Sequence, residues 1–162
     1  MTLGLDARFD LDASDITRAW LGRSATFHPD RATGDLAPDE LARRSALLNR
    51  AKETLADPER RAVALLAVLG GPPAEECKDL PDGFLMKIFD VRQAMEEAVS
   101  SGDESDRGVF ERLASERRSA HIQRVGALFR AADGSQDGPG LTEIRVELNA
   151  WRYIERMIEQ LD

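Results

Sequence analysis

The stretch AWLGRSATFHPDRATGDLAPDE, residues 19–40, decides the fold that the sequence predicts. At its centre stands the polar tripeptide His28-Pro29-Asp30, which follows one helical run and precedes another. Pro29 fixes its own φ, lacks an amide donor and disfavours the α conformation at the residue before it, so the first helix must stop at His28. The imidazole of His28 and the carboxylate of Asp30 are therefore expected on an exposed turn.

Both runs beside the tripeptide carry apolar residues at helical spacing, which predicts two amphipathic helices. The apolar face of residues 11–27 consists of Ile16, Ala19, Trp20 and Phe27. The second helix is expected from about Pro38 to the Asp57-Pro58 pair, which ends it. Its apolar stripe consists of Leu41, Leu48 and Leu55. The sequence thus predicts a helical hairpin with the tripeptide in its turn.

This hairpin resembles the J-domain, the module that docks on a DnaK-type chaperone and stimulates its ATPase. Further stretches make the chain similar to one branch, the HscB family of iron–sulfur co-chaperones. They are Leu3-Gly4-Leu5, Phe9, Leu11-Asp12, Leu48-Asn49, Thr54-Leu55, Asp57-Pro58, Arg61-Ala62, Leu65-Leu66 before Gly70, and Phe84-Leu85-Met86 with Arg92. The resemblance implies an all-α fold, in which an N-terminal J-domain-like helical hairpin with a truncated first helix is followed by a C-terminal three-helix bundle.

Two stretches rich in proline and glycine mark the expected domain boundary, Gly70-Gly71-Pro72-Pro73 and Pro81-Asp82-Gly83. We therefore expect a J-domain over residues 1–71, a linker over 72–83 and the bundle over 84–162. Helical spacing predicts the helices of this bundle over about 83–101, over about 106–132 and from about 141 onward.

Composition narrows the function classes. The formal charge of −8 argues against a nucleic-acid surface. No apolar run approaches the roughly 20 residues of a transmembrane helix, and the first residues do not form a signal peptide. The single cysteine, Cys77, excludes an intramolecular disulfide and a cysteine-built metal site, and we expect an incidental linker thiol there. The sequence predicts a soluble cytoplasmic protein with no nucleic-acid or membrane partner, no metal and no cofactor.

The resemblance implies that a DnaK/HscA-type chaperone is bound by His28, Pro29, Asp30 and Arg31, with Arg18 and Arg23 on the preceding helix. That helix carries fewer cations than is usual in J-domains, and Gly22 interrupts it. Arg23 falls on the predicted buried face, where an arginine is expected to extend its guanidinium past the edge of the core. Only Met1 and Thr2 precede the segment where J-domains end a short first helix.

The helix expected over residues 83–101 has an unusually wide apolar surface. Its core stripe consists of Phe84, Ile88, Val91, Met95 and Ala98, and beside that stripe lie Leu85, Met86 and Phe89. From the residues alone, an alternative interpretation is that the bundle simply buries this helix more deeply. The resemblance implies instead a binding surface for an IscU-type iron–sulfur scaffold protein, formed by Leu85, Met86, Phe89, Asp90, Arg92, Gln93 and Tyr153. Tyr153 has an alternative interpretation as a boundary tyrosine with a solvated hydroxyl.

An enzyme is the first alternative class. The sequence has no Ser-His-Asp pattern, no glycine-rich phosphate loop and no metal-ligand spacing, and its two histidines fall in different predicted domains, so no catalytic residue is expected. His121 is expected to be a hydrogen-bonded structural residue. The second alternative is a divergent J-protein adaptor for another client, with weakened chaperone activation. Exposure of the wide apolar face would favour scaffold binding, and the same face would also permit self-association.

Overall fold

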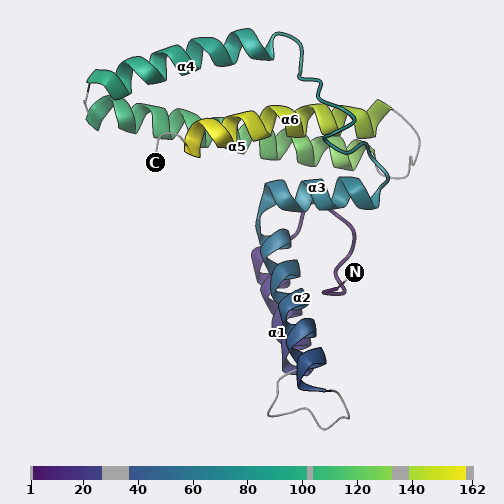
Figure 1. Cartoon of the computed structure of the whole chain (residues 1–162). Helices are drawn as coiled ribbons and strands as arrows, with labels where there is room; N and C mark the ends of the chain where they lie inside the picture. The colour runs from purple at the N-terminus through teal and green to yellow at the C-terminus, as the bar shows by residue number, and fades with distance from the viewer. Residues whose placement is uncertain (1, 27–36, 102–103, 133–138, 160–162) are drawn as a thin grey trace. The chain divides into compact units, whose positions relative to one another are not determined.

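The computed structural model describes residues 2–26, 37–101, 104–132 and 139–159 (Figure 1). Its regular structure in these ranges is entirely helical, which confirms the predicted fold class. The elements are α1 (Ala13–Thr26), α2 (Pro38–Ala56), α3 (Pro58–Val68), α4 (Phe84–Ser101), α5 (Glu104–Ala131) and α6 (Pro139–Glu159). The chain divides into two compact units, Met1–Val68 and Leu69–Asp162. The predicted turn residues His28, Pro29, Asp30 and Arg31 lie outside the described residues.

In the first unit, α1 and α2 lie side by side as an antiparallel hairpin (Figure 1). The small core of the hairpin contains Leu3, Ile16 and Leu48, with Leu5, Leu11, Ala19, Trp20, Ala51 and Leu55 packed around it. One polar contact also joins the two helices, because Nε1 of Trp20 donates a 2.9 Å hydrogen bond to Oδ1 of Asn49. The ammonium of Lys52 lies 4.0 Å from the centre of the same indole ring, at cation–π distance.

The junction between α2 and α3 is a capped turn. Oδ1 of Asp57 accepts a 2.9 Å hydrogen bond from the amide of Arg60, and Pro58 occupies the first helical position. Arg61 donates from Nη1 to the carbonyl of Leu55 at 2.6 Å, at the end of α2. Burial lowers the pKa of Arg61, and this effect is opposed by the charges of Asp10 and Asp57. The pair Asp57-Pro58 therefore ends one helix and begins the next.

The N-terminal segment contains no helix in residues 2–12. Leu3 and Phe9 are nevertheless buried. Gly4 has a φ of +73°, and Nη2 of Arg23 lies only 2.6 Å from the point where a Cβ at Gly4 would stand. Arg23 is exposed on α1, so its guanidinium extends past the core edge as expected and covers the N-terminal backbone.

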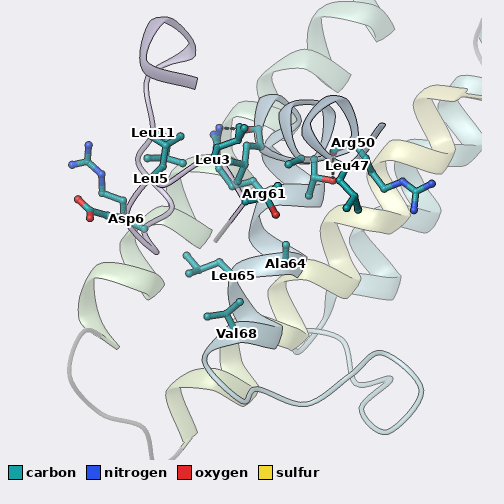
Figure 2. A pocket seen from close by; sticks show the side chains of 15 residues that line it. Leu3, Leu5, Asp6, Leu11, Leu47, Arg50, Arg61, Ala64, Leu65 and Val68 are labelled. Carbon is teal, nitrogen blue, oxygen red and sulfur yellow. Dashed lines mark hydrogen bonds between the residues drawn. The ribbon is translucent and has the colours of Figure 1, made fainter. Parts of the chain in front are cut away.

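An open, mainly apolar pocket of about 320 Å³ lies in the first unit between this N-terminal segment, α2 and α3. Figure 2 shows Leu5 and Leu11 at its N-terminal side and Leu65 and Val68 on α3. Val68 remains largely exposed. Part of the apolar surface of α3 is therefore uncovered within this unit.

The second unit is built on α5 and α6, which lie side by side along their length (Figure 1). Its buried apolar residues include Val125, Phe129, Leu141, Ile144, Leu148, Trp151 and Ile154. The third helix, α4, packs against α6 through Ile88, which contacts Ile154 and Met157. The arrangement is the three-helix bundle that the sequence predicted.

The stretch predicted as a linker lies along α6. Arg145 is buried, and its Nε donates a 2.8 Å hydrogen bond to the carbonyl of Pro72. Nδ2 of Asn149 donates to the carbonyls of Cys77 and Asp79, both at 3.0 Å. Burial lowers the pKa of Arg145, opposed by Cys77 and Glu75. These contacts hold the chain before α4 in one path and bury Cys77.

Candidate protein-binding surfaces

One face of α4 is buried in the bundle and the other is exposed to solvent. Ile88 is buried, and Phe84 and Val91 are half-buried against α6. On the outer side, the exposed fractions of Leu85, Met86 and Phe89 are 56%, 78% and 65%. The interpretation that the bundle buries the whole apolar surface of this helix is therefore wrong for these three residues. We call Leu85, Met86, Phe89 and Tyr153, which is 42% exposed, the apolar face.

A pocket of about 370 Å³ joins the α4 and α6 parts of the apolar face. Its apolar and aromatic lining consists of Leu85, Ile88, Phe89, Tyr153 and Met157. Two cations, Arg92 and Arg156, complete it. Residues that are more than 60 positions apart in the sequence thus form one concave surface, as the prediction for the apolar face required.

Polar side chains surround the apolar face on α4. Nε of Arg92 donates to Oε1 of Glu96 at 3.0 Å, and Nε2 of Gln93 donates to Oε1 of Glu97 at 3.3 Å. Asp90 is exposed one residue after Phe89. Apolar residues with an ionic rim are typical of a protein-binding surface.

Sequence analysis missed Arg156 as a site residue. It lies three residues after Tyr153 on α6, at helical spacing, and that spacing is the only signal in the sequence that could have indicated it. A single arginine on an amphipathic helix is usually a solvated residue. Its position in the pocket depends on how α4 packs on α6.

Aromatic ring contacts and polar contacts support the start of α4. The ring of Phe84 meets the rings of Tyr153 and His121 edge-on, with centroids 6.0 and 6.5 Å apart. Nδ1 of His121 lies 2.6 Å from Oε1 of the buried Glu147, so it carries the proton that the carboxylate accepts. Nε of Arg124 lies 2.9 Å from the other oxygen of Glu147. The prediction that His121 is a hydrogen-bonded structural residue is confirmed.

Behind Tyr153, α6 is held to α5 by Glu155. Its Oε1 accepts hydrogen bonds from Nε of Arg118 at 2.7 Å and from Nε1 of Trp151 at 2.8 Å. Burial alone would raise the pKa of Glu155. The hydrogen bonds from Arg118 and Trp151, with the charges of Arg118 and Arg152, outweigh burial and lower this pKa below its ordinary value.

The structure describes two of the predicted chaperone-binding residues. Arg18 is exposed on α1, where Nη1 pairs with Oδ1 of Asp15 at 3.0 Å. Such an exposed pair contributes little to stability, so Arg18 is accessible to a partner. The guanidinium of Arg23 lies over Gly4 instead. Within the described part of the chain, no helix is long and apolar enough to cross a membrane.

Comparison with known proteins gives consistent matches. Residues 80–162 match the family model described as the HSCB C-terminal oligomerisation domain. The chain is 32% identical to a co-chaperone protein HscB homolog of Bordetella petrii, over 98% of this chain and 90% of that protein. It is 30% identical to the mitochondrial J-type co-chaperone jac1 of Schizosaccharomyces pombe, over 94% of this chain and 65% of that protein.

Two solved structures share the fold. The crystal structure of human co-chaperone protein HscB matches with a TM-score of 0.79 at 20% identity, over 99% of this chain and 78% of that chain. Chaperone HscB from Vibrio cholerae matches with a TM-score of 0.65 at 22% identity, over 99% and 97% of the two chains.

The helical fold and the relatives that match nearly the whole of this chain together define a J-type co-chaperone. Within that class, the chain belongs to the HscB family. The resemblance stated from the sequence is therefore confirmed, and so is the co-chaperone function that it implied.

Proposed function

We propose that this protein brings an IscU-type iron–sulfur scaffold protein to a DnaK/HscA-type chaperone and stimulates the ATPase of that chaperone. The J-domain, predicted over residues 1–71, engages the chaperone through His28, Pro29, Asp30, Arg31, Arg18 and Arg23. The predicted bundle, residues 84–162, binds the scaffold through Leu85, Met86, Phe89, Asp90, Arg92, Gln93 and Tyr153.

The exposure of the apolar face is the observation that carries this proposal. Three neighbouring apolar residues of α4 are each more than half exposed, and the pocket connects two of them to Tyr153. A contiguous apolar patch favours a protein partner, because covering it removes apolar surface from water at about 25 cal/mol per Å². Leucine, methionine and aromatic side chains also suit such contacts.

The proposed advantage of binding the chaperone and the scaffold with one chain is a high effective concentration of each partner near the other. When one chain holds both partners, the second encounter becomes a local one, which raises its apparent affinity without a new contact. ATP hydrolysis and cluster chemistry then belong to the partners, and this chain itself needs neither a catalytic residue nor a cofactor. Cytoplasmic localisation remains a prediction, since one of the relatives is mitochondrial.

The first test is steady-state ATP hydrolysis by purified DnaK-type chaperones of the same cell. We expect this protein to stimulate hydrolysis and the scaffold to increase the stimulation further. The variant His28→Gln should keep the helical circular dichroism spectrum and lose the stimulation. Stimulation retained by His28→Gln would contradict the role of the tripeptide.

The second test separates the scaffold site from the chaperone site. The double variant Leu85→Ala, Phe89→Ala should lose scaffold binding and keep the basal stimulation of the chaperone. Val109→Ala is the matched control, because Val109 is 48% exposed on α5 and does not line the pocket. Scaffold binding unchanged in the double variant would mean that another surface binds the scaffold.

A second candidate use of the same face is self-association. The description of the matching family model as an oligomerisation domain and the exposure of the apolar face support it. Sedimentation velocity of the wild type and of the Leu85→Ala, Phe89→Ala variant decides between the two. A concentration-dependent dimer that the double variant abolishes would favour self-association over scaffold binding. An adaptor for a different client predicts a monomer that stimulates the chaperone and does not bind the scaffold.

A further inference from the structure

We infer that the pocket between α4 and α6 accepts an aliphatic side chain of the partner and that Arg156 pairs with a carboxylate next to that side chain. This inference rests on the proposed function, because it assigns partner chemistry to the same surface. It adds Arg156 as a specificity-determining residue and predicts an aliphatic–acidic pair of neighbouring residues on the scaffold.

The shape of the pocket suits a single inserted side chain. Leu85 and Phe89 line it from α4, while Tyr153 and Met157 line it from α6. Its volume of about 370 Å³ leaves room for an aliphatic side chain of a partner. Because five of the lining residues present aliphatic or aromatic carbon, an apolar group suits this part of the pocket, since an uncharged polar group there would lose hydrogen bonds to water.

The charges at the pocket determine which charge a partner residue next to that apolar side chain should carry. Both ionic residues that line it, Arg92 and Arg156, are cations. Arg92 is already paired with Glu96 at 3.0 Å. The guanidinium of Arg156, in contrast, forms no ion pair or hydrogen bond with any other residue that the structure describes. A partner that covers the pocket would desolvate Arg156, and only a carboxylate on the partner would compensate for this cost.

A second copy of this chain is the less suitable occupant. A two-fold contact places the same patch of both copies against itself. The pocket lining of a second copy contributes only cations, Arg92 and Arg156, so that lining offers Arg156 no carboxylate, and like charges brought together at an interface oppose association. A partner with an acidic residue beside an aliphatic one has the complementary charge.

Arg156 is exposed, so its substitution is compatible with folding. We therefore propose titration calorimetry of the full chain with the purified IscU-type scaffold, using Arg156→Lys, Arg156→Gln and Arg156→Glu. We expect near-wild-type affinity for Arg156→Lys, about three- to tenfold weaker binding for Arg156→Gln and at least tenfold weaker binding for Arg156→Glu. Basal stimulation of the chaperone without scaffold should be unchanged in all three.

A matched control separates the effect of the position of Arg156 from the effect of the change in net charge. Arg112→Glu makes the same change in net charge at an exposed arginine of α5 that does not line the pocket, and it should leave scaffold affinity unaltered. Raising the salt concentration should weaken wild-type binding and narrow the difference between wild type and Arg156→Glu. Replacing one exposed acidic residue of the scaffold by lysine should restore binding to Arg156→Glu and to no other variant.

The outcomes separate this inference from the proposed function. If Arg156→Glu binds the scaffold as tightly as wild type while Leu85→Ala, Phe89→Ala does not bind, the role of Arg156 is wrong and the scaffold site stands. If the double variant also binds normally, the proposed scaffold site itself fails, and the inference fails with it. A wild-type dimer that Arg156→Glu dissociates would overturn the assignment to the scaffold and make a second copy the occupant.

Discussion

The ring of Tyr153 on α6 meets the ring of Phe84, the first residue of α4, edge-on, with centroids 6.0 Å apart and planes at 79°. This contact orients the exposed side of α4. Successive residues of an α-helix point about 100° apart, so turning Phe84 toward α6 turns Leu85 and Met86 away from it. The aromatic pair therefore holds the apolar face toward solvent.

Replacement of Phe84 should lower the stability of the second unit. Phe84→Leu keeps an apolar side chain but removes two ring contacts, each worth about 0.5–1.5 kcal/mol, so we expect a loss of about 1–3 kcal/mol. Urea unfolding with hydrogen exchange of the α6 amides measures it. Phe89→Leu, an exposed position on the same helix, should change stability by less than about 0.5 kcal/mol. Equal effects of the two substitutions would contradict the role given to Phe84.

Substitution by alanine at two glycines of the first unit should change its stability in opposite directions. A Cβ at Gly22 meets nothing within 4 Å, so Gly22→Ala should stabilise α1 by about 0.5–1 kcal/mol. Gly4 has a φ of +73° and lies under the guanidinium of Arg23, so Gly4→Ala should cost about 1–2 kcal/mol. Urea unfolding monitored by hydrogen exchange of the α1 amides compares them. Destabilisation by Gly22→Ala would mean that α1 requires glycine there for another reason.

The hydrogen bond from Trp20 to Asn49 should couple α1 to α2 energetically. Trp20→Phe and Asn49→Ala each break it, so a double-mutant cycle should give a coupling free energy of about 0.5–1.5 kcal/mol. The free energies come from urea titrations of the four proteins. A cycle of Trp20→Phe with Arg43→Ala, an exposed change on α2, should give additive effects. Additivity in the first cycle as well would show that the bond contributes nothing measurable.

Stability should depend on the ionisation of Glu155. Its pKa is lower in the folded protein than in the unfolded chain, so its stabilising contribution is complete above the ordinary carboxyl pKa of about 4.3. That contribution is lost as the pH falls through the folded pKa. The difference in Tm between wild type and Glu155→Gln should thus be largest near neutral pH and decrease below about pH 4.3.

The control for this prediction is Glu159→Gln, an exposed carboxylate on the same helix. It should change Tm little at any pH, since exposed charges contribute little to stability. A Tm difference between wild type and Glu155→Gln that stays constant from pH 7 to pH 3 would show that the carboxylate form is not what stabilises the α5–α6 contact.

Helices and their ends were predictable because their causes are local. The 3.6-residue spacing of apolar side chains and the breaks at Asp57-Pro58 and Pro81-Asp82-Gly83 placed α2 and α4 within a few residues of their observed bounds. The inward positions of Phe84, Ile88 and Val91 on α4 were also predicted correctly, and the side chains of Met95 and Ala98 lie outside what the structure describes. Proline and glycine act on their own backbone, so no distant contact was needed to interpret them.

The structure of the N-terminal segment was less predictable. Arg23 stood where a buried residue was expected, and the sequence alone did not indicate what its guanidinium would meet. In the fold the guanidinium lies over Gly4, nineteen residues earlier, because the segment before α1 packs beside this helix. Burial depends on which other segment covers a face, and helical spacing indicates only which residues share that face.

By itself, the sequence determined the helical elements, the His28-Pro29-Asp30 tripeptide and the membership of the HscB family that these motifs indicated. Only the tertiary structure decided that Leu85, Met86 and Phe89 face outward and that Arg156 joins Leu85 and Phe89 in one pocket. A wide apolar helix is equally compatible with deep burial and with partner binding. The packing of Ile88 on Ile154 and Met157, a contact between residues far apart in the chain, leaves the other side of α4 uncovered and thereby distinguishes the two.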